Sequence, residues 1–170
     1  MTSRVGIRWT NRSALAIAPG ADPVLAVQEA AQALVLKARE AGWVGPPFNP
    51  IKIVEMLGAR TSANASISDA RLLASPDGPV VEYNPQQPRE RMRFSIAHEV
   101  AHLLFPDWRD EVRNRGGSAS ADDWQLEMLC NIAASEFVLP IGSLLQGFET
   151  ASIEDLMFER RRYDVSAEAF

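Results

Sequence analysis

The sequence of 170 residues is poor in cysteine and histidine, with one of the former and two of the latter. A single cysteine cannot form an internal disulfide, which is typical of proteins in a reducing compartment. No stretch approaches the roughly 18 apolar residues of a membrane span, and residues 1–13 lack the apolar run of a secretory signal. These absences predict a cytoplasmic protein that is not embedded in a membrane.

An excess of basic residues is also missing. The chain has 17 lysines and arginines against 22 acidic residues, which gives a formal net charge of −5. This balance argues against a protein that coats nucleic acid or a membrane surface, although it leaves room for a local basic patch. The hydrophobic share of 46% is ordinary for a globular protein, and the length predicts a single domain with a real core.

Hydrophobic spacing and turn signals predict an α+β fold. We expect helices over residues 23–41, 50–58, 88–106, 121–139 and much of 142–170. Three short strands follow the second helix, around residues 59–65, 70–75 and 79–83. The turn sequence PDG separates the last two strands. We therefore expect a helical domain with a small three-stranded antiparallel sheet, its helices and sheet in 22–140 and a helical C-terminal region in 141–170.

Three titratable residues interrupt an otherwise largely apolar segment, residues 91–106: His98, Glu99 and His102. Residues four apart lie one turn above each other on a helix, so the two imidazoles can point at one metal ion. Glu99 follows His98 directly and can reach a water molecule on that metal. This is the H-E-x-x-H arrangement, in which two histidines bind zinc and the glutamate is a general base.

A plainer interpretation is that the two histidines are core residues bonded to backbone carbonyls and that Glu99 is a solvated helix residue. Both histidines of the chain fall inside the motif, however, and three polar groups on an apolar helix would then need separate compensation. One metal ion accounts for all three. We therefore interpret the segment as the larger part of a zinc site.

A catalytic zinc ion needs a third protein ligand and an open position. Since the chain has no third histidine, that ligand must be a carboxylate or Cys130, which excludes the three-histidine zinc families. Helical phase favours Glu127, which shares a stripe with Asn131, and Asp123 one turn earlier is the main rival. The other downstream candidates are Asp107, Asp110, Glu111, Asp122 and Glu136.

Cys130 could also act on this site as an inhibitor rather than as the third ligand. It lies three residues after Glu127, so a thiolate there could occupy the open position as an inhibitory metal ligand. Oxidation or a movement of the helix would then switch the enzyme on. The alternative is a small buried apolar residue, which is the usual role of a lone cysteine.

Two segments, RMRFSIAHEVAHLLF and the later ExxCNIAASEFVLP, together resemble the ImmA/IrrE-type zinc metallopeptidases. Their pattern is an Arg-x-Arg-Phe lead-in, the H-E-x-x-H motif and a later Glu-x-x-Ala-Asn that ends in an apolar residue and proline. The matching positions are Arg91, Arg93, Phe94, His98, Glu99, His102, Glu127, Asn131 and Pro140. The sequence departs from the pattern at Cys130, where the family has alanine, and at Ala133, where it has phenylalanine. The resemblance covers about residue 50 to the end.

The resemblance implies a zincin-like peptidase domain with one zinc ion on His98, His102 and Glu127. Glu99 would be the general base of peptide hydrolysis, and Asn131 would orient Glu127 by a hydrogen bond or serve helix packing. It further implies site-specific cleavage of a helix-turn-helix repressor in a response to DNA damage, mobile elements or phage. We expect the chain to be part of a longer protein, with a sensory domain or a nucleic-acid signal among its partners.

Several assignments stay open at this point. Arg160, Arg161 and Arg162 could reach phosphates, which would make the protein a DNA- or partner-binding module with a structural zinc, although a solvated charged helix face is the simpler interpretation. Residues 106–124 could be a lid over the cleft or only a solvated connector. The candidates for stabilising an oxyanion are Tyr83, Arg93 and Tyr163.

Overall fold

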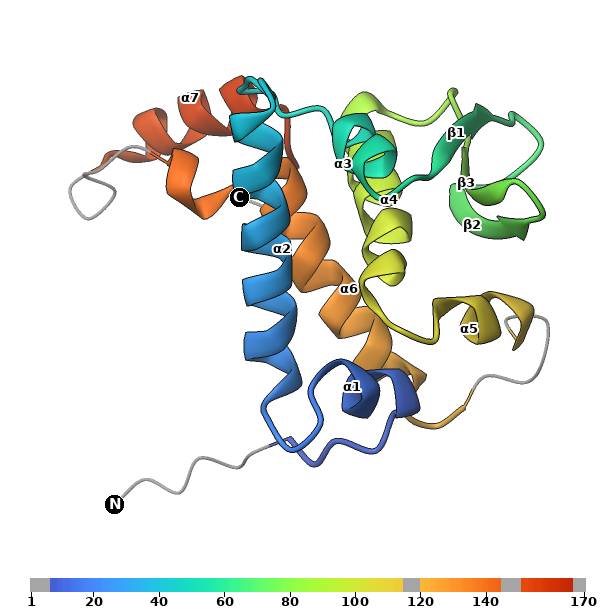
Figure 1. Cartoon of the computed structure of the whole chain (residues 1–170). Helices are drawn as coiled ribbons and strands as arrows, with labels where there is room; N and C mark the ends of the chain where they lie inside the picture. Colours follow the sequence, from blue (N-terminus) through green and yellow to red (C-terminus); the bar gives the residue numbers. More distant parts are fainter. Residues whose placement is uncertain (1–6, 115–119, 145–150, 167–170) are drawn as a thin grey trace, which may run out of the picture.

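The computed structural model describes residues 7–114, 120–144 and 151–166, and within them it confirms the α+β class (Figure 1). The α-helices are α1 (Arg12–Ile17), α2 (Pro23–Glu40), α3 (Ile51–Met56), α4 (Arg89–Ala101), α5 (Trp108–Asn114), α6 (Asp123–Val138) and α7 (Ile153–Tyr163). Two 3-10 turns are η1 (His102–Leu104) and η2 (Ile141–Ser143). The strands are β1 (Arg60–Ala63), β2 (Ala70–Ser75) and β3 (Gly78–Tyr83).

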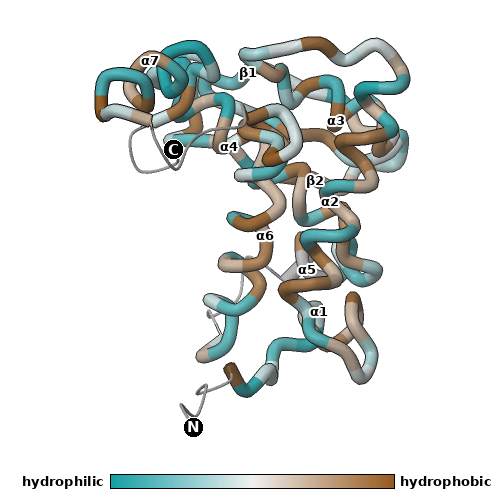
Figure 2. Tube along the Cα trace, turned by 90° about the vertical axis from the view of Figure 1, so that its left-hand side faces the viewer, coloured by the Kyte–Doolittle hydropathy of each residue, from teal (hydrophilic) through white to brown (hydrophobic). Residues whose placement is uncertain are grey.

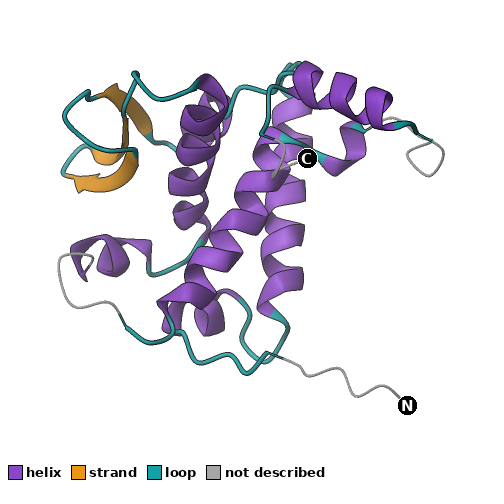
Figure 3. Ribbon diagram, turned by 180° about the vertical axis from the view of Figure 1, so that it is seen from behind, coloured by secondary structure: helices purple, strands orange, loops and turns teal. Residues whose placement is uncertain are grey.

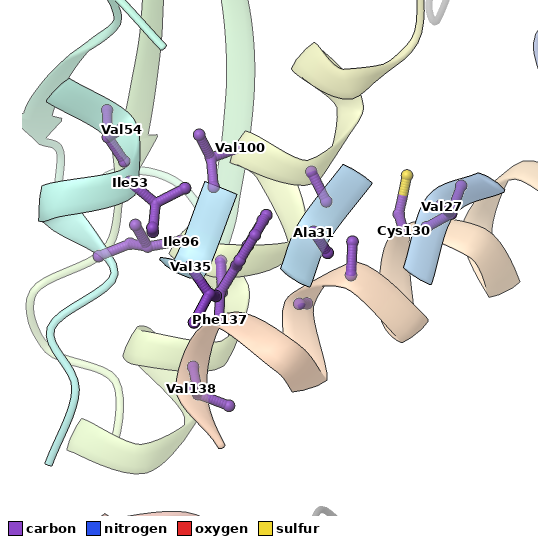
Figure 4. Packing of buried hydrophobic residues seen from close by; sticks show 14 of the residues in the cluster. Val27, Ala31, Val35, Ile53, Val54, Ile96, Val100, Cys130, Phe137 and Val138 are labelled. Atoms are coloured by element: carbon purple, nitrogen blue, oxygen red, sulfur yellow. The ribbon is translucent and has the colours of Figure 1, made fainter. Parts of the chain in front are cut away.

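Helices α2, α4 and α6 pack together and enclose the core. Along α6, apolar and polar residues alternate, as expected for a helix with one face on the core (Figure 2). Ala31 of α2 and Ala133 and Ala134 of α6 are fully buried, and such small side chains let helices approach closely. Figure 4 shows Val35 of α2 next to Phe137 of α6 in the same core. No described helix is long and apolar enough to cross a membrane.

The sheet is mixed rather than wholly antiparallel. Its strand order is β1-β3-β2, with β2 antiparallel to β3 and β1 parallel to β3, so the prediction for β1 was wrong. Two chain reversals leave β1 and β3 pointing the same way, and β3 lies between the other two. Leu72 and Val81 are buried where the sheet packs on α4. The sheet and α7 lie at opposite sides of the molecule (Figure 3).

Helix α4 begins directly after Pro88, as the sequence predicted, and ends where η1 starts at His102. His102 has φ −57° and ψ −27°, so it continues the helical phase of α4 and stays one turn from His98 on the same face. Helix α1, which Asn11 caps, was not foreseen, and α5 occupies the start of the expected connector. Of the predicted C-terminal helical region, residues 145–150 and 167–170 lie outside the described part.

Candidate metal centre

The end of α4 and the start of η1 bring three possible ligands together. One ligand atom each from His98, Glu99 and His102 lies within 4.8 Å of the others. The two imidazole rings have centroids 5.2 Å apart and planes inclined by 71°. His102 and Glu99 are buried, and His98 is partly so. The spacing of four residues therefore does converge both imidazoles on one point.

Glu127 of α6 faces both imidazoles across the helix interface. Its Oε2 lies 2.9 Å from His98 Nε2, and its Oε1 lies 3.8 Å from His102 Nε2. The side chain of Glu127 is 50% exposed whereas that of His102 is 2% exposed, so the cluster is open to solvent on the Glu127 side. Each carboxylate oxygen thus faces a different histidine.

Asn131 holds His98 in one tautomer. Its Oδ1 lies 2.9 Å from His98 Nδ1, and because an amide oxygen can only accept, Nδ1 is the nitrogen that carries the proton. Nε2 is then the nitrogen that would offer its lone pair to a metal ion when one binds. The sequence offered Asn131 either a hydrogen bond to Glu127 or a role in helix packing, and the structure places its amide oxygen on His98.

Glu99 is fixed by the sheet. Its Oε2 accepts a hydrogen bond of 2.7 Å from the backbone N–H of Leu72 in β2, and both residues are buried. The bond joins α4 to β2 and holds the carboxylate beside the two imidazoles. Sequence reasoning missed this contact because a backbone donor carries no residue-type signal.

The residues present fit a divalent metal ion. Ligands bonded at about 2.0–2.1 Å to a tetrahedral zinc ion lie about 3.3–3.5 Å from one another. The separations of 2.9 and 3.8 Å between Glu127 and the two Nε2 atoms bracket that spacing. Two imidazoles and a carboxylate are also a donor set that zinc accepts. The cluster is therefore compact enough and of the right chemistry for one ion.

The charges around His98 raise its pKa in the metal-free chain. Burial by itself lowers the pKa, but the hydrogen bond that protonated His98 donates to Glu127, the charges of Glu127 and Glu99 and the Asn131 contact together outweigh burial. The negative charges beside His98 thus favour the protonated, positively charged imidazole. A metal ion at this place would replace that proton.

Cys130 lies on the core side of α6. It is fully buried, it belongs to the hydrophobic cluster, and Figure 4 shows its sulfur beside Val27 of α2. The group of metal-capable side chains in the described residues does not include it. This placement favours the small apolar role, and ligation of zinc by Cys130 stays a prediction to be tested.

The rival carboxylates have other partners. Asp123 Oδ2 accepts from the backbone of Ser120 at 2.6 Å, and Asp107 and Asp110 lie 3.7 Å from Arg12. Glu136 accepts from the backbone of Ile141 at 3.3 Å. Asp122 bonds the Ser120 hydroxyl, and the side chain of Glu111 is outside the described part.

Two of the three oxyanion candidates have structural contacts. The buried guanidinium of Arg93 donates to the carbonyl oxygens of Phe48 and Tyr163, at 2.6 and 2.9 Å. The Tyr163 hydroxyl donates to the Ser143 carbonyl at 2.6 Å. Tyr83, at the end of β3, is partly buried and remains a candidate.

Residues 55–170 match the family model described as the IrrE N-terminal-like domain, of the peptidase M78 type. The chain belongs to this metallopeptidase family. Over 97 residues it is 33% identical to the radiation response metalloprotease IrrE of Deinococcus deserti. That alignment covers 54% of this chain and 34% of the relative, so the chain spans about a third of the relative's length. Membership confirms the predicted family and indicates a metal-dependent peptidase domain.

Proposed function

We propose that this IrrE-like domain is a zinc-dependent, site-specific endopeptidase. His98, His102 and Glu127 would hold the metal, and Glu99 would be the general base. The observation that carries the proposal is the convergence of both imidazole Nε2 atoms on the two oxygens of Glu127, at 2.9 and 3.8 Å. Membership in a metallopeptidase family supports it.

When bound, zinc would polarise the scissile carbonyl and lower the pKa of a water molecule. Glu99 accepts the proton of the attacking water and then delivers it to the nitrogen of the leaving amine, so the bond to nitrogen breaks without a free amide anion. The bond from Leu72 N–H holds Glu99 in place for both transfers. Asn131 bonds His98 Nδ1 and so directs Nε2 at the metal position.

We further propose that the substrate is a helix-turn-helix repressor, cleaved in a response to DNA damage, mobile elements or phage infection. The relative in Deinococcus deserti is named a radiation response metalloprotease, which supports a stress context. A DNA-binding role for Arg160–Arg162 is less favoured. Arg160 donates to the carbonyl of Val165 at 3.1 Å, and Arg162 pairs with Glu159 at 3.2 Å, so both already serve α7 and its end.

The test is Glu99→Gln, with Glu90→Gln on the same helix as the control. We expect Glu99→Gln to keep stoichiometric zinc and to lower cleavage of a candidate repressor about 10²–10⁴-fold, because only proton transfer is lost. Glu90→Gln should cleave like the wild type. Cleavage by Glu99→Gln at the wild-type rate would contradict the assignment.

X-ray absorption at the zinc edge of the reduced protein tests the ligands directly. Only nitrogen and oxygen neighbours at about 2.0–2.1 Å would support the set of two histidines and a glutamate. A sulfur neighbour at about 2.3 Å would place Cys130 on the metal and indicate a latent enzyme. A chain that takes up no zinc after reconstitution would overturn the hydrolase proposal.

A further inference from the structure

The segment before α2 contacts both parts of the chain that carry the proposed metal ligands. It lies outside residues 55–170, which match the family model, yet α1 packs near the first turn of α6 (Figure 1). Residues 8–13 make these contacts. We call these residues the N-terminal clasp.

Gln125 ties the clasp to α6. Its Oε1 accepts hydrogen bonds from the backbone N–H groups of Thr10 and Asn11, both at 2.9 Å, and its Nε2 donates to the carbonyl of Arg8 at 2.8 Å. The side chain is almost fully buried. Gln125 precedes Glu127 by two residues, which is about 200° around the helix, so the two side chains point to opposite faces of α6.

Ser13 ties the same clasp to the other ligand-bearing part. Its hydroxyl donates to Asp107 Oδ2 at 3.0 Å, and Ser13 is fully buried. Asp107 follows η1, which begins at His102, and Phe105 between them is fixed in the core. One short segment therefore bonds to α6 two residues before Glu127 and to the chain five residues after His102.

We infer that the N-terminal clasp sets the spacing between Glu127 and the histidines, and that Gln125 is a positioning residue for the metal. This rests on the proposed zinc site. Burial of the Gln125 amide with three backbone partners fixes the height and rotation of the first turn of α6. Loss of the amide frees that turn, and the carboxylate then meets the two imidazoles in the right geometry less often.

The experiment measures the zinc dissociation constant by chelator competition and the melting temperature of the metal-free chain. Variants are Gln125→Met and Ser13→Ala, and Asn84→Leu is the matched control. Asn84 is also a buried amide, and its side-chain hydrogen bonds go to the loop backbone of Ile67 and Gln86 rather than to either ligand-bearing segment. We expect Gln125→Met to weaken zinc binding about 10-fold to 100-fold and Ser13→Ala to weaken it less. Asn84→Leu should lower the melting temperature and leave zinc affinity within about twofold.

Wild-type zinc affinity in both clasp variants would overturn the inference, as would an equal loss of affinity in Asn84→Leu, since general destabilisation would then explain it. If Gln125→Met does not fold, the zinc dissociation constants of Ser13→Ala and Gln125→Glu replace it in the comparison. Ser13→Ala removes only one oxygen atom. Failure of the wild type itself to bind zinc would instead refute the proposed metal site.

Discussion

Helix α4 carries two buried polar clusters that are completed in opposite ways. At Arg93, a donor group meets acceptors: the guanidinium bonds the carbonyls of Phe48, Tyr163 and Asp164 and lies 3.3 Å from the Asp164 carboxylate. At His98 and His102, the two Nε2 atoms face the two oxygens of Glu127, at 2.9 and 3.8 Å. The first cluster joins a fixed cation to acceptors of the chain itself. The second brings nitrogen and carboxylate oxygen atoms together in an arrangement that a proton or a metal ion can bridge.

The difference separates a structural charge from a functional one. Burial lowers the pKa of Arg93, and the Asp164 carboxylate opposes this, so the arginine serves as a fixed cation that joins α4 to the end of α7. Asp164 adopts φ +56°, a left-handed conformation, where α7 stops. The family motif that contains Arg93 therefore includes a residue that supports the fold rather than the chemistry.

Arg93→Met should produce the largest effect on stability. Removal of the guanidinium leaves the buried carbonyls of Phe48 and Tyr163 without their donor and leaves Asp164 with Arg89 alone, at 2.8 Å, which costs about 3–5 kcal/mol in the free energy of unfolding. Arg91→Met is the control, because Arg91 is exposed and its pair with Asp69 should contribute less than about 1 kcal/mol. Urea unfolding of both metal-free variants measures this. Equal losses of stability in the two variants would contradict the structural role of the buried Arg93 guanidinium.

Zinc removal should affect only the histidine cluster. At a free zinc concentration 100 times the dissociation constant, the metal adds about 2.7 kcal/mol to the stability of the native chain. We expect this increment to vanish in His102→Ala and to persist in Arg91→Met. Thermal unfolding with and without a chelator measures it. If the chelator does not change the wild-type melting temperature, the proposal that zinc binds at the histidine cluster is contradicted.

The histidine cluster could be predicted from the sequence because its geometry is local. His98 and His102 are four residues apart on one helix, so their convergence needs no knowledge of the rest of the fold. Glu127 was predicted from the stripe it shares with Asn131, and the structure places it against both histidines. Its role as ligand is still a prediction.

Contacts that depend on tertiary packing could not be predicted. The Leu72 amide and the carbonyl partners of Arg93 are backbone groups, which every residue has. The parallel pairing of β1 with β3 depends on which strand is central, and short strands do not encode that order. Helix α1 has six residues, too few for a periodic signal, and is held by the Asn11 cap and its neighbours.

Cys130→Ala tests which side of α6 the thiol serves. Because the sulfur packs in the core near Val27, we expect a loss of about 1 kcal/mol in the free energy of unfolding and an unchanged zinc dissociation constant. Cleavage should not speed up, with or without reductant. A faster variant, or one that binds zinc differently, would instead support the inhibitory thiolate and move Cys130 into the metal cluster.

The smallest expected effect is the pH dependence of stability that arises from His98. In the metal-free chain the pKa of His98 is raised, so the native state binds this proton more tightly than the unfolded chain does. That stability is fully present below about pH 6.5, the pKa of an unperturbed histidine, and is lost as pH rises through the raised pKa. Zinc competes with the same proton, so the stability gained from zinc should increase over the same range. NMR titration of the imidazoles measures the pKa, and Glu127→Gln should lower it. A His98 pKa that is unchanged in Glu127→Gln would mean that the carboxylate does not supply the charge that holds the proton.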